Sequence, residues 1–153
     1  MPHSRRRDAA RLALALVVYT WPVVAMAPAQ AATASCLGQP ATIVGTNGND
    51  IITGTDGDDV IAGLGGDDTI DGRGGNDIIC GDDGRDSLSG GAGQDKLYGG
   101  PGDDDLSGGA GDDQLYGEAG NDSMSGGPGA DICDGGPGTD QADSTCETIR
   151  NVP

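Results

Sequence analysis

One nine-residue period runs without interruption through most of this sequence. Residues 45–143 divide into eleven nonapeptides with no insertion or deletion. In every unit the first and fourth places are Gly and the sixth is Asp. The eighth place is Ile or Leu in the first eight units and Met, Cys and Ala in the last three. Such a strict period is typical of solenoids, in which each repeat buries its apolar side chain only by stacking on its neighbours.

The repeated positions of the array define its candidate functional residues. The sixth-place aspartates are Asp50, Asp59, Asp68, Asp77, Asp86, Asp95, Asp104, Asp113, Asp122, Asp131 and Asp140. The first- and fourth-place glycines include Gly45, Gly48, Gly54, Gly57, Gly63, Gly66, Gly72, Gly75, Gly90, Gly93, Gly99, Gly102, Gly108 and Gly111.

Each unit predicts one very short strand and one tight turn. Places seven and nine vary freely around the apolar eighth place, which predicts a three-residue strand with one inward side chain. In the six residues before it, Gly permits positive φ and lets carbonyl groups point inward without a clash at Cβ. A Gly-rich linker has no reason to place an apolar residue at every ninth position, so the pattern excludes simple disorder.

The ninth places reveal a second period. In units five to nine they alternate between Ser and Tyr: Ser89, Tyr98, Ser107, Tyr116 and Ser125. This alternation indicates that units i and i+2 are neighbours, so one full coil consists of two units and contributes two strands. Successive coils then stack as parallel strands about 4.8 Å apart. The predicted fold is all-β: a parallel β-roll, or solenoid, of eleven nonapeptide repeats with two repeats per coil.

The acidic composition requires a cation. The chain has a formal net charge of -17, 30 Gly and no Phe. One apolar side chain in nine residues buries too little surface to offset the entropy of ordering the backbone, and stacked carboxylates repel one another. Such a chain also repels nucleic acid and anionic lipid, so we expect neither nucleic-acid binding nor membrane insertion.

The donor types favour Ca²⁺. Carboxylates and backbone carbonyls are hard oxygen ligands, which suit the six to eight flexible ligands of Ca²⁺ better than the strongly hydrated Mg²⁺. Zinc prefers His or Cys, and the only histidine, His3, lies far outside the array. We predict ions between the turns of units i and i+2, in up to nine sites that combine an Asp carboxylate with turn carbonyls. Nine ions would nearly balance the net charge of -20 on residues 45–143.

The units match G-G-x-G-x-D-x-U-x, where U is apolar, and the array therefore resembles the RTX (repeats-in-toxin, or haemolysin-type) calcium-binding repeats. The resemblance implies a β-roll whose turns bind calcium through the aspartates and glycines named above. It also implies a small secreted protein with little besides the array. The second place departs from Gly at Thr46, Thr55, Leu64, Arg73, Asp82 and Glu118. The fifth place departs from Asn or Asp at Arg85, Gln94, Ala130 and Thr139, which predicts weaker sites near those units.

The segments outside the array are short. Residues 5–7 are basic, residues 12–27 are mostly apolar, and small residues lead up to Ala31, as in a cleavable secretory signal. Pro22 and Pro28 interrupt the apolar run and argue against a membrane anchor. Ile43 precedes Ile52 by nine residues, which predicts a degenerate repeat unit that closes the N-terminal end. We expect a signal peptide at 1–31, an N-terminal cap at 32–44, the β-roll at 45–143, a C-terminal cap at 144–153, and a secreted, extracellular protein.

Four cysteines allow three disulfide pairings. With about 18 residues per coil, Cys80 and Cys133 lie three coils apart, about 14 Å at the parallel spacing, whereas a disulfide spans at most about 7 Å between Cα atoms. Cys36 is farther still from Cys133 and Cys146, so the coil geometry predicts Cys36–Cys80 and Cys133–Cys146, one at each end. The alternative is free thiols, which an oxidising compartment disfavours.

No arrangement in the array indicates catalysis. A serine, cysteine or zinc hydrolase needs a His that the array lacks, and carboxylates are too abundant for any one pair to suggest a glycosidase. We predict a non-catalytic calcium-binding protein that is disordered without calcium and folds when calcium binds. The alternative is a calcium-stiffened adhesin or matrix protein with a cell-surface or glycan partner. Tyr98 and Tyr116 could form a sugar-binding ladder, although a stacked pair that stabilises the sheet is the simpler interpretation.

Overall fold

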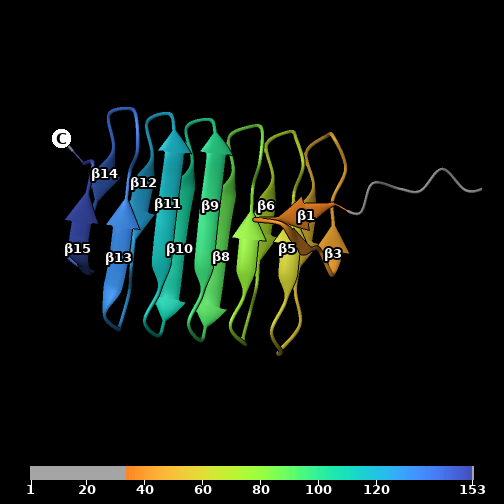
Figure 1. Ribbon diagram of the computed structural model, residues 1–153, viewed down its shortest axis with the longest axis horizontal. Helices are drawn as coiled ribbons and strands as arrows, with labels where there is room; N and C mark the ends of the chain where they lie inside the picture. The colour runs from red at the N-terminus through yellow and green to blue at the C-terminus, as the bar shows by residue number, and fades with distance from the viewer. Residues whose placement is uncertain (1–33, 153) are drawn as a thin grey trace, which may run out of the picture.

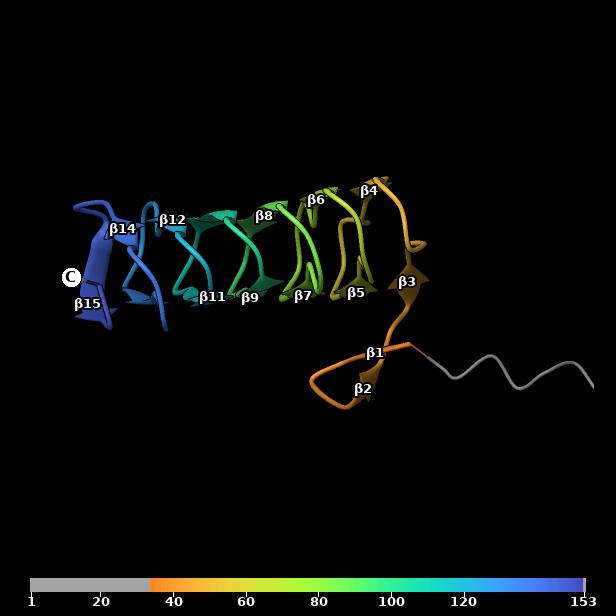
Figure 2. The same cartoon turned by 90° about the horizontal axis from the view of Figure 1, so that it is seen from above.

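The computed structural model describes residues 34–152 as a rod of stacked coils with a small hairpin beside one end (Figure 1). Each full coil contributes one strand to each of two parallel sheets, which face each other across a narrow interior (Figure 2). Residues 34–152 contain no helix, and accordingly no helical segment that could cross a membrane. The predicted parallel β-roll with two repeats per coil is confirmed. The predicted signal peptide at 1–31 lies outside the described residues.

The odd-numbered units form a six-stranded sheet. Its strands, in spatial order, are β4 (Ile51–Thr53), β6 (Thr69–Asp71), β8 (Ser87–Ala92), β10 (Asp105–Ala110), β12 (Ser123–Ser125) and β14 (Gln141–Ala142).

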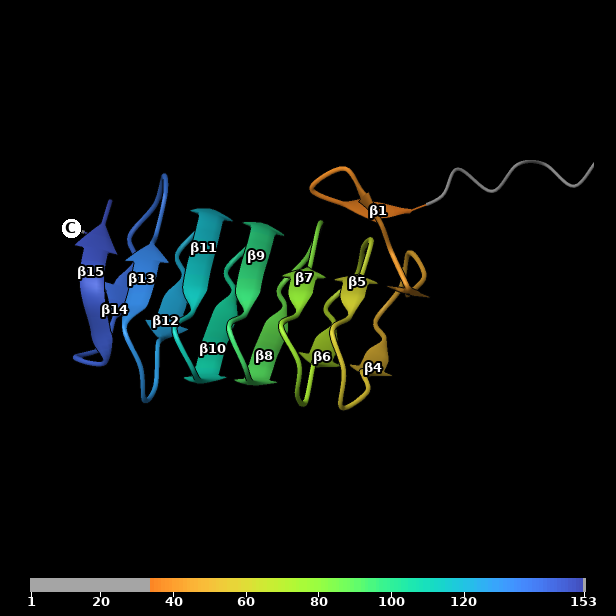
Figure 3. The ribbon, with the colours of Figure 1, turned by 60° about the horizontal axis from the view of Figure 1, so that its bottom comes forward.

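The even-numbered units form a seven-stranded sheet together with one strand from each cap. Its strands, in spatial order, are β3 (Ile43–Val44), β5 (Val60–Ala62), β7 (Ile78–Cys80), β9 (Lys96–Pro101), β11 (Gln114–Ala119), β13 (Asp131–Asp134) and β15 (Cys146–Arg150). Figure 3 shows the chain passing from one sheet to the other at every turn.

In both large sheets each strand pairs in parallel with the strand two repeats away, so that Leu97, for example, lies beside Leu115. This register confirms that units i and i+2 are neighbours. The rings of Tyr98 and Tyr116 stack with centroids 4.7 Å apart and planes 8° from parallel. The alternation of Ser and Tyr therefore reflects two sheets, of which only one carries the aromatic pair.

The eighth-place side chains of both sheets fill the interior of the rod. Nearly all of them are less than 3% exposed, and Ile52 at the N-terminal end reaches 9%. Ile43 pairs with Ile61 and packs against this core, which confirms the predicted degenerate unit at the N-terminal end. At the other end β15 adds an unpredicted strand, in which Ile149 pairs with Cys133. The rod is thus capped at both ends by incomplete units.

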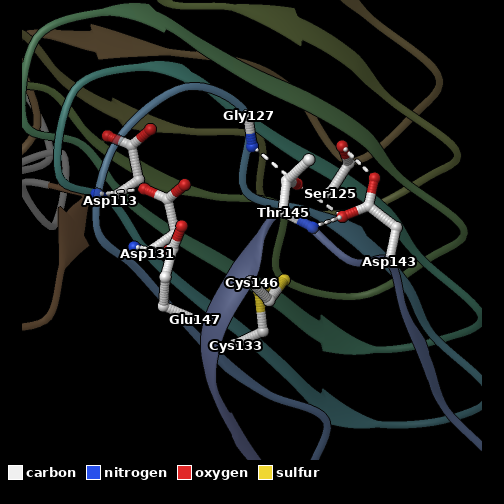
Figure 4. The surroundings of a disulfide bond; sticks show 9 residues. All are labelled: Asp113, Ser125, Gly127, Asp131, Cys133, Asp143, Thr145, Cys146 and Glu147. Carbon is white, nitrogen blue, oxygen red and sulfur yellow. Dashed lines mark hydrogen bonds between the residues drawn. A yellow bond between two sulfur atoms is a disulfide. The ribbon is translucent and has the colours of Figure 1, made fainter.

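Both predicted disulfides are present. The hairpin of β1 (Ser35–Cys36) and β2 (Gln39–Pro40) lies beside the seven-stranded sheet, with β1 against β5 and β7. Cys36 joins Cys80 there, with Cα atoms 5.7 Å apart. Cys133 joins Cys146 at the C-terminal end, with Cα atoms 5.9 Å apart (Figure 4). Each disulfide fastens one cap to the array.

Candidate metal centre

The sixth-place aspartates form two files of buried carboxylates along the rod. All of them from Asp59 onward are between 1% and 7% exposed. In nine successive links, the Oδ1 atom of one Asp accepts a hydrogen bond of 2.8–2.9 Å from the backbone N–H of the Asp two units earlier. One carboxylate oxygen of each of the nine sixth-place aspartates from Asp68 to Asp140 therefore ties adjacent coils together.

The second carboxylate oxygen, Oδ2, is buried without a protein partner in nine of the eleven units. These are the Oδ2 atoms of Asp68, Asp77, Asp86, Asp95, Asp104, Asp113, Asp122, Asp131 and Asp140. A buried polar atom without a hydrogen bond is costly, and more so when it carries charge. These nine oxygens therefore require a partner from outside the chain.

The environment disfavours ionised carboxylates in the middle of the array. Burial raises the pKa of Asp86 and Asp95 to about 6 and that of Asp104 to about 7. The hydrogen bond from the backbone of the preceding coil opposes this shift, whereas neighbouring aspartates such as Asp86, which faces Asp104, add to it. A bound cation would relieve both the desolvation and the repulsion.

First-place glycines lie too close to Oδ2 to carry a side chain. A Cβ atom on Gly63 would lie 2.4 Å from Oδ2 of Asp68 and 2.7 Å from the carbonyl oxygen of Gly81 in the next coil. The equivalent pair of oxygens flanks the corresponding point at Gly72, Gly81, Gly90, Gly99 and Gly108. A side chain is excluded at this point, and glycine therefore lets a carboxylate oxygen and a carbonyl oxygen of the next coil approach the same part of the turn. Both are hard donors of the kind that Ca²⁺ prefers.

The physical reason for glycine differs between the first and fourth places. Of the two reasons that the sequence gives for glycine, positive φ and freedom from a clash at Cβ, only the second applies at the first place, because the first-place glycines do not adopt positive φ. The fourth-place Gly93 has a φ of 141°, and a Cβ atom there would lie 1.7 Å from the carbonyl oxygen of Gly75. The fourth place of this unit therefore needs glycine for both conformation and space.

The donor set fits Ca²⁺. Within residues 34–152, no three side chains of His, Cys, Asp or Glu are grouped so as to hold a metal ion. Each centre instead combines a buried carboxylate oxygen with backbone carbonyls of the turns, which are hard donors. A thiolate or imidazole site for Zn²⁺ would need different ligands.

The six departures from Gly at the second place fall into two groups. Leu64, Arg73, Asp82 and Glu118 have φ values of 82°, 74°, 68° and 72°, in the same left-handed region as the second-place glycines. Thr46 and Thr55 do not adopt this conformation, and they bond instead to Oδ2 of Asp50 and Asp59. Asp50 and Asp59 are accordingly the two sixth-place aspartates whose Oδ2 atoms have partners.

Fifth-place Asn and Asp residues link coils, a role that the sequence reasoning missed. The side-chain oxygen of Asp67, for example, accepts the backbone N–H of Arg85 at 3.0 Å. The same bond recurs from Asn49, Asp58, Asn76, Asp103, Asp112 and Asn121. These exposed side chains already serve the backbone of the next coil.

A second missed residue is Glu147 in β15. Ile149 pairs with Cys133, so Glu147 stands where the sixth place of a twelfth unit would be. Its Oε2 atom accepts the backbone N–H of Asp131 at 2.5 Å, as Oδ1 of an Asp does elsewhere (Figure 4). The segment from Glu147 to Arg150 reads E-T-I-R, a variant of D-x-U-x, and this resemblance could have revealed it.

Together these features define a class of protein: a parallel β-solenoid whose turns present buried carboxylates and carbonyls to cations. The family model described as RTX calcium-binding nonapeptide repeat matches residues 44–79, 80–115 and 107–142. The chain belongs to this family, and Ca²⁺ is the ligand expected at its centres. A comparison with curated proteins finds no match.

Proposed function

We propose that this protein is a secreted, non-catalytic calcium-binding β-roll whose folding is completed by Ca²⁺ between stacked turns. The observation that carries the proposal is the set of nine buried Oδ2 atoms without a partner. Bound Ca²⁺ would supply positive charge to a segment, residues 45–143, whose own net charge is -20. The chain supplies the carboxylate oxygens and the carbonyl oxygens of the following coil, which first-place glycines allow to approach the same part of the turn.

Folding and binding are coupled in this proposal. In the unfolded chain, carboxylates and carbonyls from units i and i+2 are not brought together, so the centres do not exist there. In the folded chain without ions, the ionised aspartates are desolvated and lie close to one another. Calcium therefore stabilises the folded state by binding to it and not to the unfolded one.

Secretion is supported by the signal-like sequence of residues 1–31 and by the two disulfides, which are typical of oxidising compartments. An extracellular module of this kind would bind calcium in the range of about 10⁻⁴–10⁻³ M. N-terminal sequencing of protein recovered from the culture medium tests this part. A mature chain that begins at Ala32 is expected, and retention of the whole chain inside the cell would contradict secretion.

Far-UV circular dichroism of the disulfide-bonded protein tests the coupling. In excess chelator we expect little β-sheet signal, and added Ca²⁺ should restore it cooperatively while Mg²⁺ at the same concentration does not. A complete β-sheet spectrum in chelator that calcium leaves unchanged would contradict the proposal.

A second candidate function is a calcium-stiffened adhesin or matrix protein. One observation favours it: a hollow of about 150 Å³ between the β1–β2 hairpin and the seven-stranded sheet, lined by Tyr98, Leu37, Cys80 and Glu118. An aromatic ring beside a polar side chain suits a sugar with an apolar face. Calcium-dependent retention on a glycan matrix, abolished by Tyr98→Ala, would support this function. Equal retention of the variant would reject it.

A further inference from the structure

We infer that the second-place residue decides whether a unit takes an ion, and that Thr46 and Thr55 close the centres of the first two units to calcium. The inference rests on the proposed calcium binding and specifies which units use it. It replaces the expectation that Asp50 and Asp59 are calcium ligands like the other nine sixth-place aspartates.

The two threonines give their aspartates the partners that the other units lack. Oδ2 of Asp50 accepts the backbone N–H of Thr46 at 2.6 Å and its hydroxyl at 2.9 Å. Oδ2 of Asp59 accepts the same two groups of Thr55 at 2.7 Å and 2.9 Å. A cation at this oxygen would have to displace two hydrogen bonds and would face the positive end of an N–H dipole. These two carboxylates are satisfied without it.

The contrast originates in the backbone. In units three to eleven the second-place residue has positive φ, whether it is glycine or not. The backbone N–H of Arg73 then donates to Asp71 at 3.0 Å, and Oδ2 of Asp77 in the same unit stays without a partner. Thr is β-branched and strongly disfavours the left-handed region. Thr46 and Thr55 therefore keep ordinary φ values, and their N–H groups point to the carboxylate.

The remainder of the centre is already built in the first two units. A Cβ atom on Gly45 would lie 2.9 Å from Oδ2 of Asp50 and 2.5 Å from the carbonyl oxygen of Gly63. The corresponding point at Gly54 has the same two kinds of neighbour. These units differ from the others in the hydrogen bonds at Oδ2. Replacing the threonines with glycine should therefore open the centres.

The closed units also give the rod an end that does not need calcium. The hydroxyl of Thr42 donates to Oδ1 of Asp59 at 3.3 Å, and the nearby disulfide holds Cys36 to Cys80. In a solenoid each unit is stabilised by its neighbours, so a satisfied first coil can serve as a template for the next. Calcium then becomes necessary from unit three onward.

Counting bound ions tests the inference. Native mass spectrometry of the folded protein in calcium should show two more ions in T46G/T55G than in the wild type. Arg73→Thr should remove one ion, because it converts unit four to the closed type, and the matched control Arg73→Gly should leave the number unchanged. The same number of ions in T46G/T55G and the wild type would overturn the inference. A wild type that binds no calcium would instead reject the proposed function.

Hydrogen exchange provides a measurement that does not depend on the variants folding. In the calcium-saturated wild type, the amides of Thr46 and Thr55 should be protected because both donate to a carboxylate. Rapid exchange of both amides, while the neighbouring strands remain protected, would overturn the inference.

Discussion

Replacing Asp104 with asparagine should have opposite effects with and without calcium. Asp104 is 2% exposed, its Oδ1 atom accepts the N–H of Asp86 at 2.8 Å, and its Oδ2 atom has no partner. The asparagine can keep the first bond through its carbonyl oxygen. Its NH₂ group then occupies the place of Oδ2, in the part of the turn that the carbonyl oxygen of Gly117 also borders. Both atoms flank the point where a Cβ atom on Gly99 would lie, at 2.3 Å and 2.8 Å.

The variant thus exchanges a buried, unpaired and charged oxygen for a neutral amide group. Leaving the charged oxygen unsatisfied costs about 1–3 kcal/mol, so Asp104→Asn should stabilise the calcium-free β-roll by about that amount. In calcium the same change removes a carboxylate ligand. We therefore expect one fewer bound ion and a higher calcium concentration at the folding midpoint.

Two titrations followed by circular dichroism separate these effects. Trimethylamine oxide, which favours burial, can drive folding in chelator, and D104N should need less of it than the wild type. A calcium titration without the osmolyte should show the reverse order. Asp105→Asn is the matched control, because Asp105 is exposed and carries the same charge, and it should shift stability by no more than about 0.5 kcal/mol. A loss of stability in both titrations, or an unchanged number of ions, would refute the reasoning.

Three further predictions concern space, covalent links and protons. Gly99→Ala places a Cβ atom 2.3 Å from Oδ2 of Asp104 and should lower the free energy of urea unfolding in calcium by about 1–3 kcal/mol. An unchanged urea midpoint would show that this position tolerates a side chain. The Cys36–Cys80 disulfide closes a loop of 44 residues, so C36S/C80S should lower the free energy of unfolding by about 4 kcal/mol, whereas loss of Cys133–Cys146, which closes 13, should lower it by about 3 kcal/mol. The reverse order in urea unfolding would contradict the dependence on loop length. Calcium binds the ionised carboxylate, so isothermal titration should show affinity falling as the pH drops below about 7, the pKa of Asp104. Because this folded-state pKa lies above the unfolded value of about 3.9, the calcium-free fold should gain stability as the pH falls from about 7 toward 4. A calcium-free chain that unfolds further on acidification would contradict this.

Much of this architecture follows from the sequence because it is local and periodic. One apolar residue in nine can be buried only by a short strand in a stack, and the alternation of Ser89 and Tyr98 distinguishes two sheets from one. With the coil length known, distance alone excludes a Cys80–Cys133 bond. The aspartates and the hard-oxygen donor set could likewise be predicted, because their chemistry depends on residue type.

Only the tertiary structure decided how each of these groups is used. Thr46 and Arg73 both depart from glycine at the same place, yet one bonds to its aspartate and the other leaves it free. Glu147 enters the file of carboxylates after a coil slightly shorter than the repeat. The physical reason is that each centre is shared by units i and i+2, and its state depends on where φ turns a single N–H group. A nine-residue pattern specifies which atoms are present in a turn, whereas the stacking of coils determines which of them remain without a partner.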